Sequence, residues 1–184
     1  HLSYKTDVSI DFHESVLSES RRFNVRSLKP EFEKRVGNQD EYIVTIDGEG
    51  AEEIDDGLSI KELENGNYLL KVNIAHVSYY IKPGMLLFDE AIRRGSSHYP
   101  GNTCIPMLPH IISNGICSLN PGVDRLTRTV EMEINGKGEV VNYNIYNSVI
   151  NSRKAMKYSE VNKVLNNEYV EGYENYKEQL ELMD

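Results

Sequence analysis

Cysteine is scarce in this 184-residue sequence, which contains only Cys104 and Cys117. The two form no C-x-x-C motif and have no clustered histidines, so neither a disulfide scaffold nor a zinc site is expected. A reducing, cytoplasmic environment fits this cysteine usage best. The sequence also lacks any apolar run near the ~20 residues of a membrane span, and it shows no signal peptide. No membrane association is therefore expected.

Positive charge is in short supply as well, with 20 Lys and Arg against 29 Asp and Glu and a net charge of −9. This balance argues against broad, charge-driven binding of nucleic acid, but it leaves room for a local basic groove or a metal-bridged phosphate. The length suits one domain with a sizeable core. Because the sequence begins with His1 rather than Met, we expect a fragment of a longer protein.

The negative charge is concentrated in one short stretch. Residues 40–56 contain eight acidic residues and no Lys or Arg, so they contribute −8 of the net −9. Six of these acids fall within residues 47–56, directly after an alternating, β-branched run at 42–46 that predicts a half-buried strand. Ile46 and Ile54 would anchor this acidic loop to a core and aim its carboxylates at one point.

Crowded carboxylates raise one another's pKa and repel unless a positive charge neutralises them. A hard divalent cation is the simplest remedy, and oxygen-only ligands favour Mg²⁺, Mn²⁺ or Ca²⁺ over Zn²⁺. An EF-hand loop is excluded by spacing, because counting from Asp47 places Glu52 at position 6 and Leu58 at position 12. A solvated acidic loop without a metal remains the alternative.

The remaining patterns predict an α+β fold with a mixed or mainly antiparallel sheet, hairpins and flanking helices. Two hairpins are expected around Asn65-Gly66 and Asn135-Gly136, since Asn-Gly strongly favours tight turns. The acidic loop should lie at one end of their sheet. Helices are expected near residues 12–22, from Pro30 to Gly37, at 86–94 before Gly95, at 159–165 with Ser159 as N-cap, and within 168–184. Residues 96–124 are irregular yet apolar, and such a segment often forms part of a site. A meandering connection that only covers a core is the alternative.

Several short motifs in order resemble the RNB nuclease family, the catalytic domain of ribonucleases II and R. They are Thr45-Ile46-Asp47-Gly48-Glu49, Asp55-Asp56, Asn73-Ile74-Ala75-His76-Val77-Ser78-Tyr79-Tyr80, Arg94-Gly95-Ser96-Ser97-His98-Tyr99, Ile105-Pro106-Met107-Leu108-Pro109, Ser113-Asn114-Gly115-Ile116-Cys117-Ser118-Leu119-Asn120-Pro121, Val123-Asp124-Arg125-Leu126-Thr127 and Ser152-Arg153. The resemblance spans roughly residues 42–165, and the ribonuclease R branch is the nearer one.

The resemblance implies processive 3′→5′ hydrolysis of single-stranded RNA to nucleoside 5′-monophosphates with Mg²⁺, Mn²⁺ being possible. Its four motif acids fall on Asp47, Glu53, Asp55 and Asp56, although the family usually has Asp where this sequence has Glu53. Asp47 and Asp56 are expected to bind metal directly and Glu53 to make a weaker or outer contact. Asp55 is expected to be the most critical residue, orienting water or metal.

Three further residues match positions expected to touch RNA. Tyr99 corresponds to a family aromatic that stacks on the terminal base, and its alternative is a buried core tyrosine. Arg153 and Lys154 are expected to contact phosphates, with a solvated pair as the alternative. Residues 1–41 are expected to form a lead-in with short helices, and residues 42–184 the N-terminal part of the nuclease domain.

In the family, the domain continues through a downstream half and is flanked by cold-shock and S1 domains. The parent protein is expected to carry these parts, and the fragment alone is expected to be inactive. Two other hypotheses about the function stay open. One is a degenerate relative that binds RNA or protein without cutting, suggested by Glu53. The other is an acidic Ca²⁺-binding or structural module.

Overall fold

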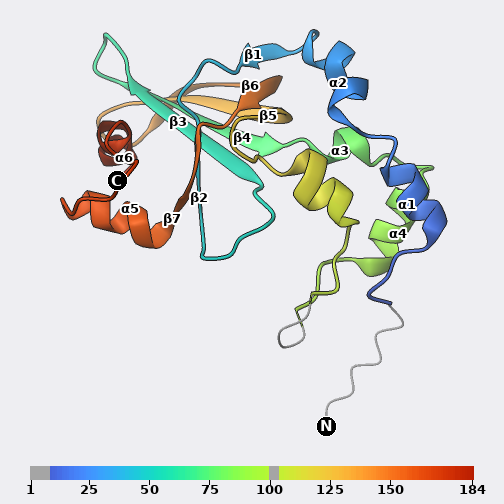
Figure 1. Ribbon diagram of the computed structural model, residues 1–184. Helices are drawn as coiled ribbons and strands as arrows, with labels where there is room; N and C mark the ends of the chain where they lie inside the picture. Colours follow the sequence, from blue (N-terminus) through green and yellow to red (C-terminus); the bar gives the residue numbers. More distant parts are fainter. Residues whose placement is uncertain (1–8, 100–103) are drawn as a thin grey trace. The chain divides into compact units, whose positions relative to one another are not determined.

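The computed structural model describes residues 9–99 and 104–184 (Figure 1). The chain divides into two compact units, His1–Leu28 with Val77–Ile116 and Lys29–His76 with Cys117–Asp184. The predicted separation of a lead-in at 1–41 from a nuclease domain at 42–184 stays a prediction. Among the described residues, no helix has the length and apolar character that crossing a bilayer requires.

The first unit is mainly helical. Its helices are α1 (Glu14–Ser20), α3 (Val77–Tyr80) and α4 (Leu86–Arg94), while α2 (Val25–Phe32) and the π-helix η1 (Ile111–Cys117) lie where the two units meet in the sequence. The Glu19 carboxylate accepts a hydrogen bond from the Leu87 amide (2.8 Å) and so caps α4. Buried Arg94 donates to Glu90 (2.7 Å) and to the Pro106 carbonyl (2.9 Å). These bonds join α4 to the segment after residue 104.

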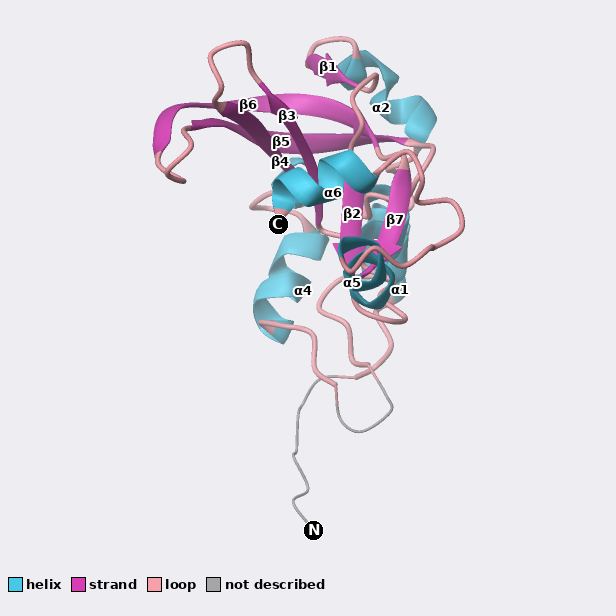
Figure 2. Ribbon diagram, turned by 90° about the vertical axis from the view of Figure 1, so that its left-hand side faces the viewer, coloured by secondary structure: helices cyan, strands magenta, loops and turns pink. Residues whose placement is uncertain are grey.

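The second unit is built on a seven-stranded sheet in the order β1-β6-β5-β4-β3-β2-β7 (Figures 1 and 2). Its strands are β1 (Val36–Asn38), β2 (Val44–Asp47), β3 (Asp56–Glu62), β4 (Tyr68–Ala75), β5 (Asp124–Ile134), β6 (Val140–Asn151) and β7 (Lys154–Lys157). The pairs β1–β6 and β2–β7 are parallel, and all other neighbours are antiparallel. The predicted α+β class with a mixed sheet is confirmed.

Both predicted hairpins form. β3 and β4 turn at Asn65-Gly66, and β5 and β6 turn after Asn135. Gly66 adopts φ 78° and Gly138 adopts φ 79°, a backbone conformation that is unstrained for glycine. The two hairpins then pair through β4 and β5, so that four antiparallel strands form the centre of the sheet.

Two helices cover the β2–β7 end of this sheet. α5 (Tyr158–Leu165) packs on β2 and β7, and α6 (Lys177–Met183) packs on β3 and on α5. Their shared core consists of Val44, Met156, Val161, Val164, Tyr173 and Leu180. This core fixes the position of β2, which leads into the acidic loop.

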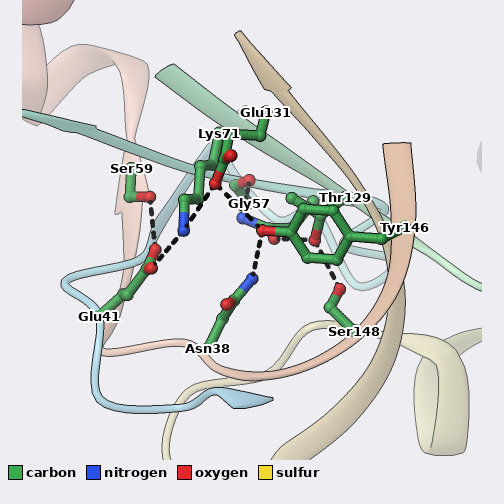
Figure 3. A network of polar contacts seen from close by, with 10 residues as sticks. Asn38, Glu41, Gly57, Ser59, Lys71, Thr129, Glu131, Tyr146 and Ser148 are labelled. Carbon is green, nitrogen blue, oxygen red and sulfur yellow. Dashed lines mark hydrogen bonds and ion pairs between the residues drawn. The ribbon is translucent and has the colours of Figure 1, made fainter. Parts of the chain in front are cut away.

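One face of the central strands carries a buried polar network (Figure 3). The Lys71 ammonium on β4 forms ion pairs with Glu41 and with Glu131 (3.1 Å). The Tyr146 hydroxyl donates to Glu131 (3.3 Å) and accepts from the Asn38 amide (3.3 Å). Because Asn38 and Glu41 precede β2, the network ties the segment before the acidic loop onto the sheet.

The predicted helix at 30–37 is wrong, because α2 begins at Val25 and residues 36–38 form β1. The start of α2 is set by Asn24 and Ser27, each of whose side chains accepts a hydrogen bond from the other's backbone N–H.

Two C-terminal helix predictions also need correction. Lys157 rather than Ser159 is the N-cap of α5, because the helix begins at Tyr158 and the backbone of Lys157 is extended. Ser159 lies inside the helix, and its hydroxyl donates to Glu49 (2.7 Å). Within residues 168–184, only Lys177–Met183 is helical. The helix at 86–94 ends at Gly95 as predicted.

Candidate active site

The acidic loop lies at the strand ends of the sheet, where it connects β2 to β3. β2 pairs antiparallel with β3 through Val44 and Leu58. Since β2 ends at Asp47 and β3 begins at Asp56, the loop between them joins two neighbouring strand ends. This places the predicted carboxylates at the end of the sheet, as the hairpin pattern indicated.

The loop is fastened to the segment that follows η1. The Ile54 amide donates to the Ser118 hydroxyl (3.2 Å), and the Leu119 amide donates back to the Ile54 carbonyl (3.0 Å). The Ala75 amide donates to the Asp55 carbonyl (2.8 Å). Ile54, between Glu53 and Asp55, is buried. The end of the irregular segment thus holds the backbone of the acidic loop, and its part in a functional site stays a prediction.

The hydroxyl of Ser118 is therefore expected to position the loop. In Ser118→Ala, the buried Ile54 amide loses its acceptor, which costs about 1–3 kcal/mol. The matched control is Ser152→Ala, because the Ser152 hydroxyl is equally buried but has no hydrogen-bond partner among the described residues. Urea unfolding should show a clear loss for Ser118→Ala and little change for Ser152→Ala. Equal losses would mean that the Ser118 bond contributes nothing specific.

The carboxylates of the loop act on one another. Burial and the charge of Asp56 raise the pKa of Asp47 above its ordinary range. Burial, followed by the charges of Glu53 and Asp56, raises the pKa of Asp55. The Asp47 Oδ2 atom is buried and has no hydrogen-bond partner among residues 9–99 and 104–184. The loop thus holds crowded negative charge at Asp47, Asp55 and Asp56, together with an acceptor oxygen that has no donor among the described residues.

This donor set fits a hard divalent cation in its chemistry, because all four groups are carboxylates and one oxygen has no partner in the part of the chain that the structure describes. Within the described part of the chain, no three acidic, His or Cys side chains meet as a ready-made metal site. Side-chain rotation would have to bring the carboxylates together around an ion. The ligand set of Asp47, Glu53, Asp55 and Asp56 stays a prediction.

The raised pKa values predict that Asp47→Asn stabilises the metal-free chain at neutral pH. A carboxyl with a higher pKa when folded binds its proton more tightly in the folded state. The loss of folding stability caused by the Asp47 charge is therefore absent well below the ordinary pKa of 3.8. This loss grows as pH rises, and it is complete above the folded-state pKa. Thermal unfolding in a chelator should show Asp47→Asn above wild type at pH 7 and level with it near pH 3. Each kcal/mol recovered raises Tm by roughly 2–4 °C. A difference in Tm between Asp47→Asn and wild type that does not change with pH would exclude titration of Asp47 as its cause.

The predicted phosphate contacts Arg153 and Lys154 lie away from the loop. Arg153 donates to the backbone carbonyls of Gln39 (3.1 Å) and Glu41 (3.4 Å). The Lys154 ammonium lies 4.4 Å from the centre of the Tyr173 ring. Both side chains thus have structural contacts, and their roles toward RNA stay predictions.

The sequence interpretation missed Lys157, the basic residue that does contact the loop. β7 runs parallel to β2 and pairs Lys157 with Asp47. The Lys157 ammonium forms an ion pair with Glu49 (3.0 Å). This contact depends on the short strand β7, which pairs with a strand far away in the sequence. No turn motif in the sequence indicates such a pairing.

Tyr99 belongs to the first unit, whereas the acidic loop belongs to the second. Tyr99 as a residue is 69% exposed, so the alternative of a buried core tyrosine is wrong. An exposed ring is compatible with base stacking, which stays a prediction.

Comparisons with known proteins agree with the α+β fold. The RNB domain family matches residues 35–184, and the chain belongs to that family. It is 51% identical over 155 residues to ribonuclease R of Thermotoga maritima, covering 84% of this chain and 22% of that protein. The chain therefore spans about a fifth of the length of this relative.

Solved structures share the fold. Mycoplasma genitalium RNase R in complex with double-stranded RNA matches with a TM-score of 0.86 and 27% identity, over 95% of this chain and 31% of that one. Yeast Ssd1, described as a pseudonuclease, matches with a TM-score of 0.68 and 19% identity, over 78% of this chain and 18% of that one. At that identity, the second match shows the fold alone.

Proposed function

We propose that this chain is part of the catalytic domain of a metal-dependent 3′→5′ exoribonuclease that hydrolyses single-stranded RNA to nucleoside 5′-monophosphates. The observation that carries the proposal is the fastened acidic loop, in which Asp47 presents a buried oxygen that no described residue donates to. Membership of the RNB family and similarity to ribonuclease R support it. In the proposal, Asp47, Glu53, Asp55 and Asp56 form the catalytic set.

These four carboxylates would hold Mg²⁺, or Mn²⁺ in its place. A bound cation supplies an activated water and neutralises charge on the phosphoryl oxygens. Asp55 would orient that water or the ion, and its position is fixed by the bonds of its own carbonyl and of the adjacent Ile54. Ser118 would act as a positioning residue, because its hydroxyl holds the backbone between Glu53 and Asp55.

The RNA would be held by groups outside the loop, with Tyr99 stacking on the terminal base and Arg153 and Lys154 near phosphates. The RNase R of Mycoplasma genitalium has been solved with ribose-methylated single-stranded RNA and with double-stranded RNA. That similarity supports RNA as the partner of this chain. The remaining RNA-binding surface would lie in the downstream half and flanking domains of the parent protein.

The proposal is tested at two levels. Calorimetry on the 184-residue chain should detect Mg²⁺ binding that Asp47→Asn and Asp56→Asn each weaken. The parent protein should then degrade single-stranded RNA from its 3′ end only when Mg²⁺ or Mn²⁺ is present. Digestion that proceeds unchanged in a chelator would contradict metal-dependent hydrolysis.

A second candidate function is RNA binding without cleavage. It is favoured by Glu53, whose side chain is longer by one methylene than the Asp usual in the family. Mg²⁺ requires near-ideal octahedral geometry, so a longer ligand can impair catalysis. A parent protein that binds RNA tightly, lacks hydrolysis and gains it on Glu53→Asp would establish this alternative.

Tyr99→Ala in the parent protein is expected to change the length of the shortest RNA left undigested. Stacking on a terminal base is worth ~1–3 kcal/mol but takes no part in bond cleavage. Electrophoresis of the final products should therefore show a shift, while the single-turnover rate on long RNA stays close to wild type. An unchanged end product would remove Tyr99 from the RNA site.

A further inference from the structure

Thr45 on β2 is a buried threonine whose hydroxyl has no hydrogen-bond partner among the described residues. Its side chain is 0% exposed. Two equally buried threonines of the same unit do have partners: the Thr129 hydroxyl donates to Asn73 (2.6 Å), and the hydroxyls of Thr127 and Ser148 form a hydrogen bond with each other (2.7 Å). Because a buried hydroxyl without a partner destabilises the folded state, the one on Thr45 needs an explanation.

The side chains beside Thr45 offer its hydroxyl no acceptor. The parallel register places Ala155 of β7 next to Thr45 on one side. On the other side, the antiparallel register of β2 with β3 brings Gly57 opposite Thr45. A Cβ added to Gly57 would lie 3.0 Å from the Ile43 side chain, so apolar groups fill this face closely. None of these three neighbours carries a side-chain oxygen or nitrogen.

Asp47 provides the missing acceptor. It follows Thr45 by two positions on β2, and side chains two positions apart in a strand lie on the same face. The Asp47 Oδ2 atom is likewise buried without a hydrogen-bond partner in the part of the chain that the structure describes. The two groups are complementary, because a hydroxyl can donate one hydrogen bond and a carboxylate only accepts.

The Thr45 hydroxyl already acts on this carboxyl. Burial and the charge of Asp56 raise the pKa of Asp47, while the Thr45 hydroxyl acts on that pKa in the opposite direction. A hydroxyl with this effect favours the charged form of the carboxyl. The charged form is also the one that binds a metal ion.

We propose that Thr45 is a positioning residue of the candidate ion site, whose hydroxyl donates to the Asp47 carboxylate and fixes its orientation for binding of Mg²⁺ or Mn²⁺. The inference rests on the proposed function, because it takes Asp47 as a ligand. Water does not compete for the hydroxyl, since Thr45 is fully buried. Its β-branched side chain also has few rotamers, which limits the freedom of the hydroxyl. Hydrogen bonds of this kind orient ligating carboxylates, and their loss typically weakens metal binding about 10–100-fold.

The test measures ion binding and stability of the 184-residue chain, without any measurement of RNA cleavage. Thr45→Val keeps the shape of the side chain but removes the hydroxyl, and calorimetry should show Mg²⁺ affinity about 10–100-fold below wild type. Thr45→Ser keeps the hydroxyl and should restore affinity close to wild type. Urea unfolding in a chelator should show little change in midpoint for Thr45→Val, because a methyl group replaces a hydroxyl that has no partner. A purely structural role predicts the reverse, with a lower midpoint and unchanged Mg²⁺ affinity.

Ser152→Ala is the matched control, because it removes another buried hydroxyl that has no partner among the described residues. Its Mg²⁺ affinity should equal that of wild type, and an equal loss in Ser152→Ala and Thr45→Val would overturn the inference. Wild-type affinity in Thr45→Val, in a chain whose affinity Asp47→Asn does lower, would also overturn it but would leave the proposed function standing. A wild-type chain that binds neither Mg²⁺ nor Mn²⁺ would contradict both. If Thr45→Val does not fold, Thr45→Ala measured against Thr45→Ser gives the same comparison.

Discussion

Asp55→Asn in the parent protein is expected to lower RNA hydrolysis by at least ~10²-fold, or nearly 3 kcal/mol of transition-state stabilisation. The substitution keeps the size of the side chain but removes a charge that Glu53 and Asp56 already crowd. RNA affinity should hold or rise slightly, because one negative charge facing the phosphates is gone. Single-turnover cleavage and RNA binding, measured on the same preparation, separate the two effects.

Two variants in the same loop serve as controls. Glu52→Gln removes an equal charge from a residue outside the predicted ligand set, so its cleavage rate should stay within a few-fold of wild type. Glu53→Asp should keep or increase the rate, since it restores the residue usual in the family. A stable Asp55→Asn protein that binds RNA and cuts at the parent's rate would end the catalytic assignment. A purely structural loop predicts lower thermal stability with little effect on turnover.

Local signals explain why so much of the fold could be predicted. Each hairpin is specified by an Asn-Gly turn and by the alternating strands on either side of it. Within each hairpin, the turn and the strands lie within a few residues of one another. Gly95 marks the end of α4 in the same local way, because glycine readily adopts the φ of 74° found there. The acidic loop was placed correctly because it directly joins two predicted strands.

Non-local pairing explains most of what the sequence did not reveal. The parallel pairings of β1 with β6 and of β2 with β7 join segments about 110 residues apart, and no turn motif connects them. The contact of Lys157 with the acidic loop depends on the second of these pairings. The hydrogen bond from Ile54 to Ser118 likewise joins residues 64 apart.

The second large effect is expected at Lys71, whose ammonium holds two carboxylates on the polar face of the sheet (Figure 3). Burial lowers the pKa of Lys71, but its hydrogen bonds to Glu41 and Glu131 outweigh burial and hold the pKa above its ordinary value. Lys71 is therefore charged at neutral pH. Lys71→Met would leave both carboxylates without this partner.

Removing one partner from a fully buried ion pair costs about 3–5 kcal/mol. Here the Glu41 and Glu131 side chains keep 32% and 28% of their exposure, so water offsets part of the loss. We therefore expect Lys71→Met to lower the free energy of unfolding by about 2–3 kcal/mol and Tm by roughly 4–12 °C. The triple variant Lys71→Met, Glu41→Gln, Glu131→Gln removes the stranded charges and should recover most of this loss. If the triple variant is no more stable than Lys71→Met, lost packing of the lysine stem, rather than unpaired carboxylates, accounts for the effect. Urea unfolding of the 184-residue chain at neutral pH distinguishes these outcomes, because it requires neither RNA nor metal.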